Sequence, residues 1–113
     1  MRQFLRAKIH KATVTEANLD YVGSITLDKD LMDLVDLSPY EKVLVVSNTS
    51  GARLETYVIE GMAESRIVCM NGAAAHLIKK GDEIIIMAFS ISDNFVKPKQ
   101  ILVDKQNKFV KYL

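Results

Sequence analysis

The sequence lacks the cysteines that disulfide-bonded and cysteine-based metal proteins need, and the long apolar runs that membrane proteins need. Its 113 residues include one cysteine, Cys69, so the chain cannot form an internal disulfide or a cysteine-based metal site. A lone thiol inside the apolar run 67–70 is typical of a buried cysteine in a reducing compartment. The longest apolar run, 84–89, is too short to span a bilayer, and the charged start of the chain favours no secretory signal. We therefore expect a cytoplasmic protein that uses no metal and no membrane.

The chain also lacks a large excess of basic over acidic residues, and it has few aromatic residues. The formal net charge is +1 at pH 7, and Phe, Trp and Tyr together make up 7% of the chain. Five lysines lie in residues 97–113 against one acidic residue, Asp104, and such a segment is usually a solvated tail. Binding to phosphates requires a basic surface, so we expect no nucleic-acid partner.

What the sequence does have is a series of short strand patterns. Leu5, Ala7 and Ile9 alternate with polar residues, which places Lys8 and His10 on one face of a strand. Apolar and β-branched runs between turn signals predict further strands. These lie at residues 23–27, 43–46, 53–59, 67–70, 83–89, 100–103 and 109–112.

Helical signals are few. Asp28 resembles an N-cap, and the apolar spacing after it predicts a helix that ends near Asp36. The alanines at 73–75 predict a second short helix over 73–77. Many short strands with two short helices favour a single, mainly β domain, folded as a small closed barrel that could form oligomers.

Four clusters could carry chemistry: Lys8 with His10, Gly23 with Ser24, Arg53 with Thr56 and Tyr57, and residues 71–75. Each alone is usually a surface group or a turn. The Gly23-Ser24 pair has a further possibility, because a serine hydroxyl can attack the preceding carbonyl, which no Cβ shields. The acyl group then moves from nitrogen to oxygen, and elimination of the ester leaves a keto group on residue 24.

Together the clusters are similar to the pyruvoyl-dependent aspartate 1-decarboxylases. The matching stretches are Lys8-Ile9-His10, Tyr21-Val22-Gly23-Ser24, Gly51-Ala52-Arg53, Thr56-Tyr57 and Asn71-Gly72-Ala73-Ala74-Ala75-His76. This resemblance implies a six-stranded double-psi β-barrel, a homotetramer with sites between subunits, and conversion of L-aspartate to β-alanine and CO2 for pantothenate synthesis. It also implies self-cleavage into residues 1–23 and 24–113, leaving a covalent pyruvoyl group on residue 24 that forms a Schiff base with substrate in place of pyridoxal phosphate.

The chemistry of such a reaction suggests roles for the matching residues. Arg53 would hold the side-chain carboxylate of aspartate, because an ion pair to the departing α-carboxylate would stabilise the ground state. Lys8 would attract the anionic substrate more weakly, and His10 would assist processing or position the substrate. Tyr57 would return a proton to Cα, and Thr56 would hydrogen-bond the Gly23 carbonyl during cleavage. A small donor-rich pocket would be formed by Asn71 and the amides of Gly72, Ala73, Ala74 and Ala75.

Strand alternation raises a difficulty for this site. Arg53 and Tyr57 share a face of their strand, whereas Thr56 points the other way. Either a bulge re-aims one side chain, or the site lies between subunits so that both faces contribute; we favour the second.

Three alternative hypotheses about function stay open on the sequence alone. The chain could be a binding module with an intact Gly23–Ser24 bond, or a nucleic-acid-binding barrel. Within the enzyme reading, glutamate is the nearest alternative substrate, because the depth of the pocket cannot be seen in the sequence.

Overall fold

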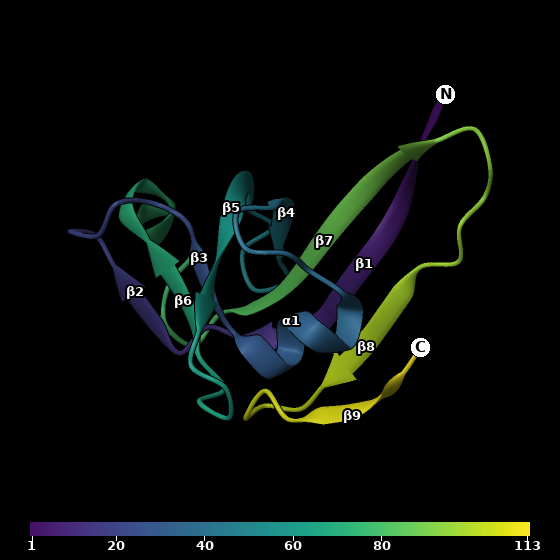
Figure 1. The fold of residues 1–113 in the computed structure, drawn as a ribbon. Coiled ribbons are helices and arrows are strands. Elements are labelled where there is room, and N and C mark those ends of the chain that lie inside the picture. The colour runs from purple at the N-terminus through teal and green to yellow at the C-terminus, as the bar shows by residue number, and fades with distance from the viewer.

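The computed structural model describes residues 1–113 and is mainly β, with nine strands and one α-helix (Figure 1). Every predicted strand is present, and one short strand, β2, was not predicted. The strands are β1 (Arg2–Thr13), β2 (Glu16–Asn18), β3 (Ile25–Asp28), β4 (Lys42–Ser47), β5 (Arg53–Gly61), β6 (Val68–Asn71), β7 (Glu83–Ser92), β8 (Lys99–Val103) and β9 (Phe109–Tyr112).

The two helical predictions have different outcomes. Helix α1 (Lys29–Val35) follows Asp28, whose carboxylate accepts a hydrogen bond from the Asp30 amide at 2.7 Å, and it ends at Asp36 in a left-handed conformation. The second segment is a 3-10 helix, η1 (Gly72–His76), rather than an α-helix over 73–77. Five residues are too few for alanine propensity to sustain α-helical turns, and short helical pieces are commonly 3-10.

All strands belong to one sheet in the order β2-β6-β3-β5-β4-β7-β1-β8-β9. The end strands do not pair with each other, so the predicted six-stranded closed barrel is not confirmed. The sheet is nevertheless strongly curled, because β1 and β2 are separated by only two residues yet occupy distant places in this order. Between them, the Thr15 amide donates to the carbonyl of Val68, which begins β6, at 2.8 Å.

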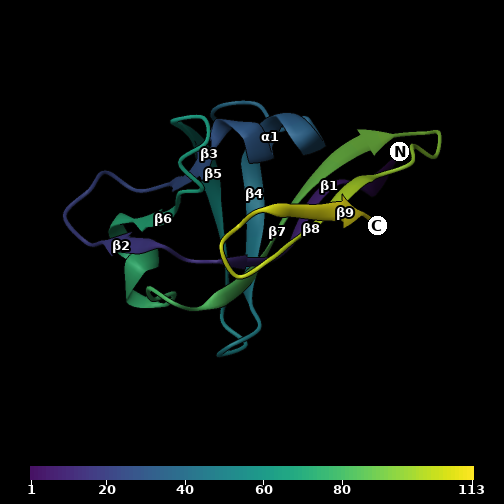
Figure 2. The same cartoon turned by 90° about the horizontal axis from the view of Figure 1, so that it is seen from below.

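The core fills the inside of this curl. Ala7 and Ile9 of β1 point inward and are buried, as the alternation predicts, so Lys8 and His10 lie on the outer face. The long β1–β7 pair extends away from the end of the molecule that carries β2 and β6 (Figures 1 and 2). The β1–β7 pair and the β2–β6 pair thus mark opposite ends of the molecule.

Candidate active site

The backbone at Gly23-Ser24 has an uncommon conformation. Gly23 has a φ of 58° and Ser24 a φ of 89°, both in the region that favours glycine. For serine this conformation costs about 1–3 kcal/mol, and such strain persists only where surrounding contacts impose it. Ser24 is also almost fully buried, with 2% of its surface exposed. The fold therefore strains the backbone at Gly23-Ser24, the pair that the sequence marked as a possible cleavage site.

The contacts that hold Ser24 come mainly from Asn71, the last residue of β6. The Asn71 side-chain amide Nδ2 donates to Ser24 Oγ at 3.0 Å and to Thr26 Oγ1 at 2.9 Å. The Asn71 backbone amide donates to the Ser24 carbonyl at 2.9 Å. One residue thus fixes both the hydroxyl and the backbone of Ser24.

Cys69 orients Asn71 in turn. Its buried Sγ donates to Asn71 Oδ1 at 3.1 Å, which leaves the Nδ2 side of the amide facing Ser24. Burial, and to a smaller degree the Glu16 carboxylate, raises the pKa of the Cys69 thiol, so it stays a neutral donor. Sequence reasoning missed Thr26 and Cys69 as site residues. Strand alternation could have found them, since Thr26 follows Ser24 by two residues and Cys69 precedes Asn71 by two.

Gly72 allows the loop that contains Gly23 to lie close to η1. A Cβ on Gly72 would come within 2.7 Å of the Gly23 nitrogen and 2.9 Å of the Tyr21 carbonyl oxygen. Gly72 also has a φ of 66°. Only glycine satisfies both conditions without displacing the loop.

A hollow of about 390 Å³ opens beside Ser24. Tyr57 Oη lies at its rim and donates to the Val22 carbonyl at 3.5 Å. Gly72 and Ala75 are buried and do not line it, whereas Leu54, Glu55 and Leu77 do and were not predicted. Its lining residues are Gly23, Ser24, Leu54, Glu55, Thr56, Tyr57, Asn71, Ala73, Ala74 and Leu77.

Thr56 and Tyr57 both reach this hollow because it lies at the edge of β5. Residues 53–57 pair with β4 alone, since β3 begins only opposite Val58. Side chains of both faces can border a space at an unpaired edge. The pairing of β5 with β4 has no register shift, so the bulge that we considered is absent.

Comparisons with known proteins identify the family of the chain. The family profile described as aspartate decarboxylase matches residues 1–110. The chain belongs to this family. An aspartate 1-decarboxylase of Desulfitobacterium hafniense (strain DSM 10664 / DCB-2) is 54% identical over 97% of this chain and 90% of its own length. One of Bacillus thuringiensis (strain Al Hakam) is 52% identical over 99% of this chain and 91% of its own. The designed msDPBB_sym2 protein is 18% identical, with a TM-score of 0.45, and covers 75% of this chain and 96% of its own.

In this member of the aspartate decarboxylase family, Arg53 lies apart from Ser24. It lines a second hollow of about 610 Å³, together with Gln3, Lys42 and Phe89. Leu54 and Glu55 border both hollows, so the two are neighbours along β5. Glu55 is paired with Lys42 at 2.8 Å, which leaves Arg53 without an ion pair inside the chain.

Lys8 and His10 also lie outside the hollow at Ser24. Their strand is flanked by β7 and β8, and Lys8 likewise has no carboxylate partner. Burial, with the nearby charges of Lys8 and Lys11, lowers the pKa of His10 below 6.5, although Glu83 opposes this. His10 Nδ1 is buried without a hydrogen-bond partner. A single chain therefore holds the candidate cleavage residues together and keeps its candidate substrate-binding cations outside the Ser24 hollow.

Two further observations concern membrane-spanning helices and groups of metal ligands. No helix is long and apolar enough to cross a membrane. No three His, Cys, Asp or Glu side chains are grouped closely enough to hold a metal ion.

Proposed function

We propose that this chain decarboxylates L-aspartate to β-alanine, with a pyruvoyl group made from its own Ser24. Membership of the aspartate decarboxylase family supports the reaction and its place in pantothenate synthesis. The observation that carries the proposal is the strained, buried Ser24, whose hydroxyl is held by Asn71 next to Gly23.

The cleavage would begin with attack by Ser24 on the carbonyl of Gly23. Ser24 Oγ attacks the Gly23 carbonyl carbon, the C–N bond breaks, and the acyl group becomes an ester on Oγ. Removal of the Ser24 Cα proton then expels the Gly23 carboxylate, which divides the chain into residues 1–23 and 24–113. The dehydroalanine left at residue 24 tautomerises to an imine, water hydrolyses this imine, ammonia leaves, and a ketone remains on residue 24. Thr56, which borders the same hollow as Gly23, would donate to the oxyanion of the first step.

The residues around Ser24 fit such a group. Ala73 and Ala74 leave room in the hollow, and Asn71 Nδ2 and Thr26 offer polar partners beside residue 24. A pyruvoyl ketone at residue 24 would supply an electron sink for the electron pair that the departing α-carboxylate leaves on the substrate. Tyr57 borders the hollow and carries a phenol hydroxyl, a group that could return a proton to Cα.

Substrate binding would require a second copy of the chain. Arg53, Lys8 and His10 do not border the Ser24 hollow, so we propose that a neighbouring subunit brings cations to it within a homotetramer. Arg53 would take the side-chain carboxylate of aspartate in a two-pronged ion pair. The continuous β1–β2 segment, which meets both β7 and β6, also supports the double-psi barrel as the underlying topology. The lone buried thiol suits a cytoplasmic enzyme.

Two measurements on one sample test this proposal. Denaturing mass spectrometry should find fragments 1–23 and 24–113, the larger one lacking ammonia relative to a serine start. The same preparation should release CO2 from L-aspartate, and a Ser24→Ala variant should neither cleave nor release CO2. Release of CO2 by the uncut Ser24→Ala protein would contradict the pyruvoyl mechanism.

A further inference from the structure

We infer that Tyr40 is a positioning residue for Tyr57 and that an ion pair from Arg6 holds Tyr40 in place. The inference rests on the role proposed above for Tyr57. It starts from the positive φ of Tyr40 in the turn formed by residues 36–41, which neither burial nor turn chemistry explains.

Tyr40 has a φ of 68°, a conformation that is rare for a bulky side chain. Glycine or asparagine would occupy this position at little cost. The Tyr40 side chain is 78% exposed, so core packing does not compensate for the strain. A strained backbone that persists at an exposed position is therefore a reason to ask what the side chain does.

The ring of Tyr40 stacks on the ring of Tyr57. Their centroids are 6.1 Å apart and the ring planes differ by 20°. Backbone hydrogen bonds fix the turn beside the same strand: the Tyr40 amide donates to the Val58 carbonyl at 2.7 Å, and the Val58 amide donates to the Glu41 carbonyl at 3.0 Å. Tyr40 is thus attached to the residue that follows Tyr57.

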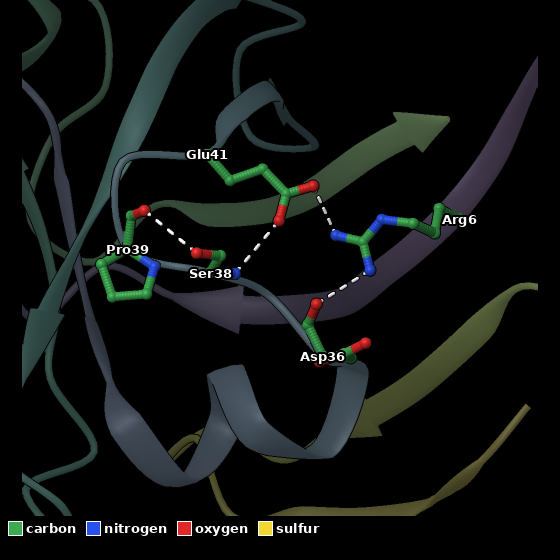
Figure 3. Close-up of polar contacts among 5 residues, drawn as sticks. All are labelled: Arg6, Asp36, Ser38, Pro39 and Glu41. Atoms are coloured by element: carbon green, nitrogen blue, oxygen red, sulfur yellow. Dashed lines mark hydrogen bonds and ion pairs between the residues drawn. The ribbon is translucent and has the colours of Figure 1, made fainter. Parts of the chain in front are cut away.

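The turn is held from its other side by Arg6 of β1 (Figure 3). One nitrogen of the guanidinium, Nη1, donates to the Asp36 carbonyl at 2.8 Å, and Nη2 pairs with the Glu41 carboxylate. The other oxygen of Glu41 accepts from the Ser38 amide at 3.0 Å. Both side chains of the ion pair are only about a quarter exposed, at 23% and 24%, so solvent weakens the pair less than at an open surface.

The stack determines where the Tyr57 hydroxyl points. That hydroxyl donates to the Val22 carbonyl and lies 3.9 Å from where a Cβ on Gly23 would be. A ring supported on one face by Tyr40 keeps its hydroxyl over the Gly23-Ser24 segment. Without that support, the Tyr57 ring can rotate toward solvent at the open edge of β5.

The Tyr40→Gly variant tests the inference because strain and stacking predict opposite effects. Relief of the strain should leave Tm unchanged or raise it, whereas loss of the ring should impair catalysis. Since aromatic pairs contribute about 0.5–1.5 kcal/mol, kcat per cleaved chain should fall about 2- to 10-fold. KM should stay unchanged, and the solvent deuterium isotope effect on kcat should increase, because proton return becomes slower. Tyr40→Phe keeps the ring and should restore kcat.

Glu64→Gly is a matched control. Glu64 also has a positive φ, of 64°, and is exposed, but it lies in the loop between β5 and β6 and does not border the Ser24 hollow. Its substitution should leave kcat and the isotope effect unchanged. Glu41→Gln, which weakens the ion pair with Arg6, should lower kcat in the same direction as Tyr40→Gly but less.

A double variant separates failure of this inference from failure of the proposed role of Tyr57. In a Tyr57→Phe background, Tyr40→Gly should cause no further loss of kcat. If Tyr57→Phe itself keeps full turnover, the role of Tyr57 is wrong. If Tyr57→Phe loses turnover while Tyr40→Gly keeps the wild-type kcat and isotope effect, only the positioning by Tyr40 is overturned.

Discussion

The surroundings of Ser24 and those of Arg53 differ in how complete they are within one chain. Ser24 is buried, its hydroxyl and carbonyl both have hydrogen-bond partners, and Gly72 lets the neighbouring loop pack closely. Arg53 is exposed and has no ion-pair partner, and it borders a larger and separate hollow. The residues proposed for cleavage are assembled within one chain, whereas Arg53, which we propose binds the substrate anion, has no ion-pair partner there.

This contrast fits the different demands that the proposed cleavage and turnover would place on the structure. The proposed cleavage would happen once and would need a strained bond with a fixed nucleophile. Turnover needs a charged substrate to enter and leave, which favours an open site completed by a second surface. Substitutions in the two regions should therefore separate the two events.

The largest expected effect is on cleavage, from Gly72→Ala. A Cβ there would clash with the Gly23 nitrogen at 2.7 Å, and φ at this residue is 66°. Overpacking costs about 1–3 kcal/mol and a left-handed alanine about 1–2 kcal/mol, so the loop should move and cleavage should slow by about 30-fold or more. Mass spectrometry of freshly purified protein over time measures this rate. Gly51→Ala, also at positive φ but with open space around it, is the matched control, and equal rates for the two would contradict the close-packing explanation.

The second-largest effect is expected for Arg53→Ala, and it should be confined to turnover. Hydrogen bonds to charged groups contribute about 1.5–3 kcal/mol each, so losing a two-pronged contact should lower kcat/KM about 100-fold or more. Cleavage should proceed as in the wild type. Lys42→Ala, which alters a charge bordering the same hollow, should have a much smaller effect. A cleavage defect in Arg53→Ala would remove the distinction between the two regions.

A smaller effect on cleavage should follow from Cys69→Val. This change removes the thiol that donates to Asn71 Oδ1, and an unsatisfied buried acceptor costs about 1–3 kcal/mol. The side-chain amide of Asn71 can then rotate so that Nδ2 no longer faces Ser24, and cleavage should slow by about 5- to 160-fold. Cys69→Ser keeps a donor and should cleave faster than Cys69→Val. The opposite order would show that Cys69 acts only by filling space.

The smallest effect concerns pH and His10, which borders neither hollow. The pKa of His10 is lowered from 6.5 in the folded state by burial and by Lys8 and Lys11, so the unfolded chain binds a proton more readily. The contribution of His10 to stability is therefore complete above about pH 6.5 and is lost as pH falls through the folded-state pKa. Urea unfolding between pH 7.5 and 5 should show a decline that is shallower in His10→Gln. An identical decline in both proteins would mean that other groups cause it.

Local patterns predicted much of the fold and part of the site. The alternation of Ala7 and Ile9 with Lys8 and His10 gave the correct inner and outer faces of β1, and Asp28 marked the start of α1 correctly. The open edge of β5 could not be predicted, because it depends on β3 beginning opposite Val58, which is a pairing between distant segments. The conformation of Tyr40 could not be predicted either, since turn chemistry favours glycine or asparagine at positive φ.

The continuous β1–β2 segment has a consequence for the mature protein. A cut after Gly23 would separate this whole segment from the rest of the covalent chain, yet β1 lies between β7 and β8 and contributes Ala7, Ile9 and Ala12 to the core. The short fragment could not leave without removing an interior strand and exposing that core. Maturation would thus convert one polypeptide into an interlocked pair of peptides, in which the smaller one is a permanent structural component and not a discarded propeptide.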